Sequence, residues 1–347
     1  MTDHKFPYKW HLKNGYPAKD INYHGCKVFG TFVCGGGSTM GYKLAGFKHI
    51  GGVEIDEKIA TVYKENHNPD YFFTEDIRLF NKREDLPSDL YNLDLLDGSP
   101  PCSSFSMAGN RDKDWGKKKK FKEGQKMQRL DDLVFEYIKT IKKLQPKVAI
   151  LENVKGLIQG NAKAYTKKIF QEFRAAGYRV QLFLLNAASM GVPQKRERVF
   201  FIGLRNDFKL PKLELSFNEK PILFGEVREK KGISTNTKRQ KLLKYRLKTD
   251  KNCNDINQRL YNKISGFNAE IVHDDNVKST ITSGEYDWRF FDGLMLHDKD
   301  YIKCGSYPLD YNFKDVKPKY LIGMSVPPVA MANISLKIYE QWLSKIK

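Results

Sequence analysis

Short apolar stretches alternate with amphipathic ones over the first 200 residues. The clearest amphipathic stretch is 131–144, where apolar side chains recur every three or four positions and so mark one face of a helix. The predicted strands are 26–33, 93–96, 148–151, 180–185 and 199–202, and the predicted helices are 56–66, 131–144 and 164–175. This rhythm predicts an α/β fold, a parallel sheet covered by helices on both faces.

The alternation of apolar and amphipathic stretches ends near Arg205. The chain is then polar, lysine-rich and irregular up to about Ser306. Order returns with the apolar stretch from Tyr320 to Pro328 and an apolar helix that reaches Leu343. The predicted organisation is a sheet domain over 1–205, an inserted second domain over 206–306, and a segment over 307–347 that returns to the first domain.

Charge and cysteine content narrow the functional classes. The chain has 347 residues, a net charge of +19 and a pI near 9.5, which favours a polyanionic partner; a generally lysine-rich proteome is the alternative. Its five cysteines form no C-x-x-C pair, so neither a disulfide framework nor a zinc site is expected. With no signal-peptide pattern and no apolar run of about 20 residues, we expect a cytosolic protein without a membrane span.

Glycines follow the first predicted strand, in Cys34-Gly35-Gly36-Gly37. A further predicted strand, between 26–33 and 93–96 in the chain, ends in Glu54-Ile55-Asp56. A glycine-rich turn lets the backbone approach a ligand, and an acidic residue at the neighbouring strand tip can bind ribose hydroxyls. By itself this pattern indicates a nucleotide-like ligand or a plain tight turn. The absence of G-x-G-x-x-G disfavours a dinucleotide-dependent oxidoreductase.

Candidate chemistry lies at the ends of two later strands. Gly98-Ser99-Pro100-Pro101-Cys102 places a thiol behind two prolines, which hold the backbone rigidly. Glu152-Asn153-Val154 follows the strand at 148–151, and Val192-Pro193-Gln194-Lys195-Arg196-Glu197-Arg198 precedes the last strand. A lone cysteine is usually a small core residue, so the flanking motif carries the functional interpretation.

Together, and in this order, these motifs resemble the DNA cytosine-C5 methyltransferases. The resemblance covers nearly all of 25–205 and 307–335, and includes Ala45-Gly46-Phe47 and Tyr307-Pro308-Leu309-Asp310-Tyr311. It implies a Rossmann-like, S-adenosylmethionine-dependent methyltransferase fold with an inserted target-recognition domain. It also implies methyl transfer to cytosine C5, with S-adenosylhomocysteine as the product and no metal.

The resemblance assigns roles to individual residues. Cys102 is the expected nucleophile, Glu152 the proton donor at cytosine N3, and Asn153 a positioning residue. Arg196 is expected to contact the cytosine carbonyl, and Arg198, on the same face by strand alternation, to brace the catalytic loop or Glu152. The residues expected to bind the cofactor are Phe32, Cys34, Gly35, Gly36, Gly37, Glu54, Ile55, Asp76, Ile77, Pro101, Ser325 and Val326.

Residues outside the catalytic motifs are expected to contact DNA. The insert occupies the place of the family's target-recognition domain, and the basic stretch after Cys102 resembles the loop that closes over flipped DNA; a solvated charged loop is the alternative. The expected DNA-contacting residues are Ser104, Lys117, Lys118, Lys119, Lys120, Gln194 and Arg289.

The chain departs from the family pattern at three points. Cys34 replaces the first glycine of the cofactor loop, Met324 replaces an asparagine, and 293–306 lacks the expected arginine. Bracing of the second domain is therefore expected to differ.

The sequence predicts a bacterial or phage DNA (cytosine-5-)-methyltransferase. It is expected to act as a monomer on duplex DNA, in the cytoplasm at the nucleoid, as a solitary enzyme or beside a separate restriction endonuclease. A tRNA methyltransferase of the same family is the first alternative, and the basic insert of about 100 residues favours duplex DNA over it. A catalytically inactive DNA-binding relative is the second, and the intact Cys102 and Glu152 disfavour it.

Overall fold

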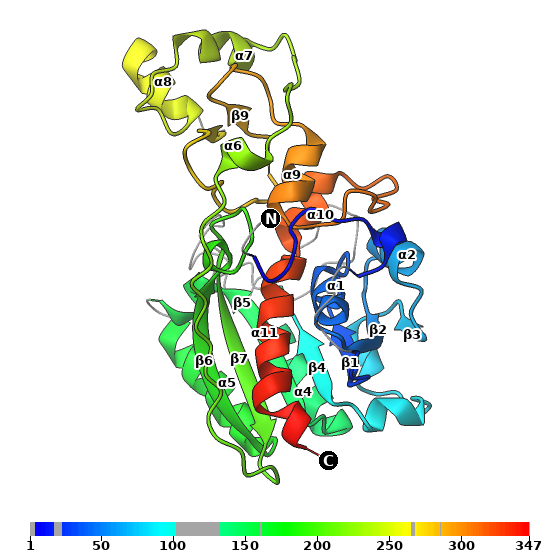
Figure 1. Ribbon diagram of the computed structural model, residues 1–347. Coiled ribbons are helices and arrows are strands. Elements are labelled where there is room, and N and C mark those ends of the chain that lie inside the picture. Colours follow the sequence, from blue (N-terminus) through cyan, green and yellow to red (C-terminus); the bar gives the residue numbers. More distant parts are fainter. Residues whose placement is uncertain are drawn as a thin grey trace. The chain divides into compact units, whose positions relative to one another are not determined.

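The computed structural model describes residues 4–16, 23–101, 132–159, 162–264, 268–284 and 286–346. Two compact units divide the chain, and Figure 1 labels the elements of both. The sheet unit comprises Ala18–Asn186, Glu197–Ser216 and Met331–Lys347. The insert unit comprises Met1–Pro17, Ala187–Arg196 and Phe217–Ala330.

Seven strands form one sheet in the described part of the sheet unit, in the order β3-β2-β1-β4-β5-β7-β6. All run parallel except β7, which is antiparallel to both β5 and β6. The link between β6 and β7, residues 187–196, is shorter than the roughly dozen residues that a parallel crossover needs, so the predicted all-parallel arrangement fails at this strand. The strands are β1 (Lys27–Thr31), β2 (Lys48–Val53), β3 (Tyr71–Phe73), β4 (Leu95–Gly98), β5 (Val148–Val154), β6 (Tyr178–Asn186) and β7 (Glu197–Arg205).

Helices cover both faces of this sheet, as the apolar rhythm predicts. Adjacent residues of a strand point to opposite faces: at the end of β4, Asp97 accepts a hydrogen bond from Tyr42 of α1, whereas a Cβ on Gly98 would meet the Tyr137 ring of α4. Figure 1 also shows α11, in red, along one face of the sheet. The helices are α1 (Gly37–Leu44), α2 (Glu57–His67), α3 (Ile77–Phe80), α4 (Leu133–Leu144), α5 (Lys163–Ala175) and α11 (Pro328–Gln341), which begins in the insert unit.

The insert unit has little regular structure, in agreement with its irregular sequence. Its small core contains Leu243, Ile256 and Trp288. A two-stranded parallel sheet of β8 (Ile271–Val272) and β9 (Trp288–Arg289) crosses it. Its helices are α6 (Phe224–Val227), α7 (Lys238–Leu242), α8 (Cys253–Tyr261), α9 (Asp298–Cys304) and α10 (Pro318–Met324).

The unit boundaries differ from those expected at 206 and 306. The N-terminal residues join the insert unit because Trp10 Nε1 donates to the Ser306 carbonyl and Leu12 N to Asp310 Oδ1. Residues 187–196 join it because Lys195 N donates to the Lys278 carbonyl. These contacts connect positions far apart in the chain, so local composition did not reveal them.

The sequence shows no apolar run of about 20 residues. By length and composition, however, one described segment, Pro318–Lys345, could cross a membrane. In the structure 83% of its most apolar window is buried. We therefore interpret it as core helix.

Candidate active site

The loop after β1 has a strained backbone that explains its glycines. Phe32, Cys34 and Gly36 all have left-handed backbone angles, with φ of 56°, 47° and 73°. A Cβ on Gly36 would lie 2.1 Å from Nε2 of the buried His67, so the position has no room for a side chain. Cys34 adopts the conformation that glycine tolerates best, which fits its place where the family has a glycine.

Glu54, directly after β2, joins this loop to the neighbouring strand. Its Oε2 accepts a hydrogen bond from Cys34 N and its Oε1 one from Asp56 N, each at 3.0 Å. Burial raises the pKa of Glu54 to about 7, although these hydrogen bonds oppose the shift. A carboxylate offers about four acceptor sites, and backbone N–H groups do not occupy all of them, so Glu54 can still accept from a ribose hydroxyl. The donor set therefore fits a nucleoside-containing cofactor.

The other expected cofactor residues fall into two groups. In the sheet unit, Asp76 caps α3, because its Oδ1 accepts from Arg78 N at 2.8 Å, and Ile77 is buried in the core. Pro101 is the last described residue before the segment that holds Cys102. Ser325 and Val326 belong to the insert unit, where both are buried and Ser325 Oγ donates to the Leu321 carbonyl.

Glu152 lies near the end of β5, buried and paired with an arginine of the adjacent strand. Arg198 Nε on β7 lies 3.1 Å from Glu152 Oε1. Burial lowers the pKa of Arg198 and the Glu152 carboxylate opposes that change. Next to this pair, Asn153 Nδ2 donates to the Pro100 carbonyl at 3.2 Å. The residue that follows Glu152 is thus hydrogen-bonded to the Pro-Pro segment that precedes Cys102.

Several expected site residues lie outside the described part of the chain. Residues 102–131 include the candidate nucleophile and the basic stretch that follows it. The assignments of Cys102, Ser104, Lys117, Lys118, Lys119 and Lys120 therefore stay predictions.

Gln194 and Arg196 are buried in the insert unit and bonded within it. Gln194 Nε2 donates to the Cys304 carbonyl and its Oε1 accepts from Ile281 N, while Arg196 donates to the carbonyls of Ile281 and Gly323. We expected Arg196 and Arg198 to share one face of a strand. Arg196 lies outside the strand, because β7 begins at Glu197. Gln194 and Arg196 both bind the backbone of Ile281, and each also binds the carbonyl of a second residue of the insert unit.

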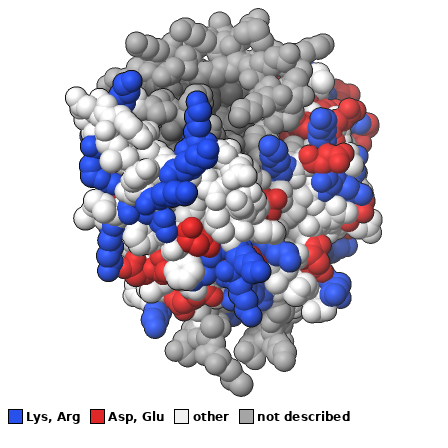
Figure 2. All heavy atoms as spheres, turned by 90° about the horizontal axis from the view of Figure 1, so that it is seen from above, with Lys and Arg blue, Asp and Glu red and all other residues white. Residues whose placement is uncertain are grey.

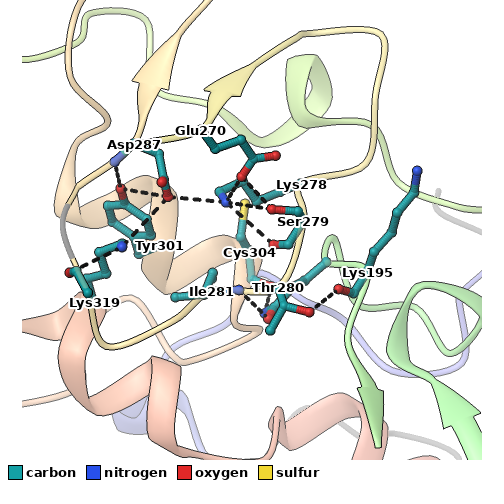
Figure 3. A network of polar contacts seen from close by, with 12 residues as sticks. Lys195, Glu270, Lys278, Ser279, Thr280, Ile281, Asp287, Tyr301, Cys304 and Lys319 are labelled. Atoms are coloured by element: carbon teal, nitrogen blue, oxygen red, sulfur yellow. Dashed lines mark hydrogen bonds and ion pairs between the residues drawn. The ribbon is translucent and has the colours of Figure 1, made fainter. Parts of the chain in front are cut away.

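Figure 3 shows a buried ion network that sequence reasoning missed. Lys278, with 1% of its surface exposed, pairs with Glu270 and with Asp287, the latter at 3.2 Å. Burial alone would lower the pKa of Lys278, but the two carboxylates raise it. Tyr301 and Lys319 complete the contacts around Asp287. The sequence held one sign of this buried network, a single lysine within the otherwise uncharged stretch 277–282. This network connects the segments around Glu270, Lys278 and Asp287 within the insert unit.

The expectation that Arg289 contacts DNA is wrong. Its side chain is fully buried, at 0% exposed. Nη1 and Nη2 donate to the carbonyls of Glu229 and Lys230, and Nη2 also pairs with Asp292 at 3.0 Å. A guanidinium committed to the interior of the unit is not available to a phosphate or a base.

The sheet order, the single antiparallel strand and the glycine-rich loop after β1 define the fold of S-adenosylmethionine-dependent methyltransferases, which confirms the predicted fold class. The chain belongs to the C-5 cytosine-specific DNA methylase family, whose model matches residues 26–340.

The chain is also similar to individual methyltransferases. The chain is 35% identical over 195 residues to the type II methyltransferase M.FnuDI of Fusobacterium nucleatum, covering 55% of this chain and 50% of that protein. It is 37% identical over 186 residues to the orphan methyltransferase M.SPRI of Bacillus phage SPR, covering 53% and 37%. The matches thus span about half or less of these relatives' lengths.

Solved structures support the fold alone. A prophage-encoded DNA modification methyltransferase from E. coli is similar with a TM-score of 0.67 and 19% identity, covering 92% of this chain and 100% of that one. The DNMT2 of Spodoptera frugiperda is similar with a TM-score of 0.59 and 16% identity, covering 91% and 100%.

Proposed function

We propose that this protein is a DNA (cytosine-5-)-methyltransferase that modifies a flipped cytosine within a specific duplex sequence. The observation that carries the proposal is the placement of Glu152. It is buried against Arg198 and, through the Asn153–Pro100 hydrogen bond, tied to the segment that enters Cys102. Addition to the cytosine ring requires a nucleophile and an acid, and Glu152 is the candidate acid.

The proposed reaction begins with attack of the Cys102 thiolate on cytosine C6. Glu152 donates a proton or a hydrogen bond to N3, which absorbs the negative charge that develops in the ring. C5 becomes enamine-like and accepts a methyl group. Loss of the C5 proton and expulsion of the thiolate then restore the aromatic ring and free Cys102. Because a free thiol has a pKa of about 8.5, the surrounding loop must favour the thiolate.

Residues of the sheet unit would hold S-adenosylmethionine, which supplies the methyl group when bound. Glu54 would accept the ribose hydroxyls, and the backbone of 34–37 would approach the ligand closely. Asp76 and Ile77 would contact the adenine and Pro101 would line the pocket. For Ser325 and Val326 of the insert unit, a role at the methionine end is proposed from the family resemblance alone.

Duplex DNA is the proposed substrate, and the charge of the chain supports it. Lys and Arg side chains are spread over the face shown in Figure 2, with Asp and Glu side chains among them. The stretch from Arg228 to Lys263 holds far more basic than acidic residues. Such charge neutralises phosphates and releases counterions. We propose a monomer acting at the nucleoid, solitary or beside a cognate restriction endonuclease. A tRNA substrate or an inactive DNA-binding relative are the competing functions.

Expression in a methylation-free strain followed by bisulfite sequencing tests the reaction and reveals the target together. Wild type should protect one cytosine in a fixed sequence, whereas Cys102→Ser should protect none while still binding DNA. A duplex with 5-fluorocytosine at that site should trap a covalent adduct, because fluorine replaces the proton that must leave. Methylation of tRNA instead of duplex DNA would overturn the substrate, and unimpaired turnover by Cys102→Ser would overturn the mechanism.

A further inference from the structure

A second buried carboxyl group lies on the strand beside Glu152. Asp97, the third residue of β4, has 3% of its surface exposed. Its Oδ1 accepts a hydrogen bond from the Tyr42 hydroxyl of α1 at 3.1 Å, and the Ser38 side chain is also hydrogen-bonded to it. The proposed reaction gives this group no role. Burying a carboxyl group costs folding free energy unless the group is paired or neutral.

Strand register places Asp97 and Glu152 on one face of the sheet. Asp97 pairs with Ile150 in the parallel β4–β5 ladder, and Glu152 lies two residues beyond Ile150. Strand spacing and rise separate the two Cα atoms by about 8 Å. On the other side of β5, Arg198 points to the same face and contacts Glu152. Three neighbouring strands therefore carry two carboxyls and one guanidinium in a row.

The charges of this row do not balance when both carboxyls are ionised. Arg198 neutralises one carboxylate, and the titratable helix residue that contacts Asp97 among the described residues, Tyr42 of α1, carries no positive charge. Tyr137 of α4 lies on the opposite face, where the charge of Asp97 raises its pKa. Burial raises the pKa of Asp97 to about 7, with a further contribution from the charge of Glu152. The row therefore tends to hold one proton near neutral pH, as coupled carboxyls do.

We propose that Asp97 is a positioning residue that controls the proton on Glu152 through its charge. The proposal rests on the proposed function, because it requires Glu152 to act as the acid. When the pair holds one proton, that proton can lie on Glu152 while Asp97 is ionised, and the negative charge of Asp97 then increases the proton affinity of Glu152. Glu152 then stays protonated, and able to serve cytosine N3, to a higher pH than it would beside a neutral neighbour.

The pH dependence of single-turnover methylation of a cognate duplex tests this assignment. The alkaline limb of the profile reports the acid that must be protonated. Asp97→Asn is permanently neutral, so the midpoint of that limb should move to lower pH by about one to two units. Tyr42→Phe removes a donor that stabilises the Asp97 carboxylate, and should move the midpoint in the same direction by less.

Asp94→Asn is the matched control. Asp94 directly precedes β4, where it pairs with Lys147, so the substitution is the same chemistry at the far end of the strand. It should leave the midpoint unchanged. A wild-type midpoint in both Asp97→Asn and Tyr42→Phe, with Asp97→Asn folded, would overturn the role of Asp97. If Asp97→Asn fails to fold, the Tyr42→Phe midpoint decides alone.

Glu152→Gln separates the two proposals. Its residual rate should lose the alkaline limb if Glu152 is the acid. If the limb disappears in Glu152→Gln but keeps its wild-type midpoint in Asp97→Asn, only the role of Asp97 is wrong. If the limb persists in Glu152→Gln, the acid is another group and both proposals are wrong.

Discussion

Arg198 Nε lies 3.1 Å from Glu152 Oε1, across the antiparallel pairing of β5 and β7, and both side chains are largely buried. Breaking a buried ion pair leaves a charge without compensation, at a cost of several kcal/mol. Arg198→Gln should therefore lower the free energy of unfolding by about 3 kcal/mol in urea denaturation. Arg205→Gln, at the exposed end of the same strand where Arg205 pairs with Asp207, should cost no more than about 1 kcal/mol. Equal losses would show that the Arg198–Glu152 pair is effectively solvated.

Cofactor affinity should depend on pH through Glu54. Burial raises the pKa of this carboxyl to about 7, and only the ionised form accepts hydrogen bonds at both oxygens without carrying a proton of its own. Affinity for S-adenosylmethionine should thus weaken as the pH falls below 7, by up to about tenfold per unit, and level off above 7. Glu54→Gln should bind weakly with a flat pH profile. Isothermal titration calorimetry of both proteins measures this, and parallel profiles would exclude Glu54 as the titrating group.

Cys34→Gly should stabilise the protein and keep its activity. Cys34 has a φ of 47°, a conformation that costs a residue with a Cβ about 1 kcal/mol and costs glycine little. We expect a gain in unfolding free energy of up to about 1 kcal/mol and turnover within a few-fold of wild type. Loss of methylation in a stably folded variant would give the thiol a role that the strain argument omits.

Gly36→Ala should be strongly destabilising, because the new Cβ would combine left-handed strain with a clash against His67. The expected cost is roughly 2–4 kcal/mol in unfolding free energy. Gly177→Ala is the matched control: its φ is +92° but no atom lies within 4 Å of the added Cβ. Its loss of unfolding free energy should therefore come from backbone strain alone and amount to about 1–2 kcal/mol. Similar losses at the two positions would argue that His67 moves aside without cost.

Changing Lys117 to Lys120 to alanine should weaken binding to all DNA sequences alike. Each phosphate contact contributes close to one unit to the slope of log K against log salt. The slope should therefore become shallower by up to about four units, while preference for the cognate site stays nearly constant, because phosphates carry no sequence information. Fluorescence anisotropy over a salt series measures both. An unaltered slope would mark these lysines as a solvated face, and a changed preference would mean that they contact bases.

The sequence by itself determined the α/β class, most strands and helices of the sheet unit, the glycine-rich loop and the order of the catalytic motifs. Helical periodicity over 131–144 predicted α4 to within two residues of its start, because it depends only on neighbouring positions. The residue types of Cys102, Glu152 and Glu54 indicated chemistry for the same local reason.

Only the tertiary structure decided which partner each charged side chain takes. Arg198, Arg196 and Arg289 are all arginines near strands, yet one pairs with Glu152 and the other two anchor backbone carbonyls inside the insert unit. In the antiparallel β5–β7 pairing Arg198 lies opposite Val154, on the same face as Glu152 two residues away, and the register of β4 on β5 brings Asp97 to that face. These relationships join residues tens of positions apart, and burial there makes a satisfied partner obligatory. No local pattern in the chain records which partner that is.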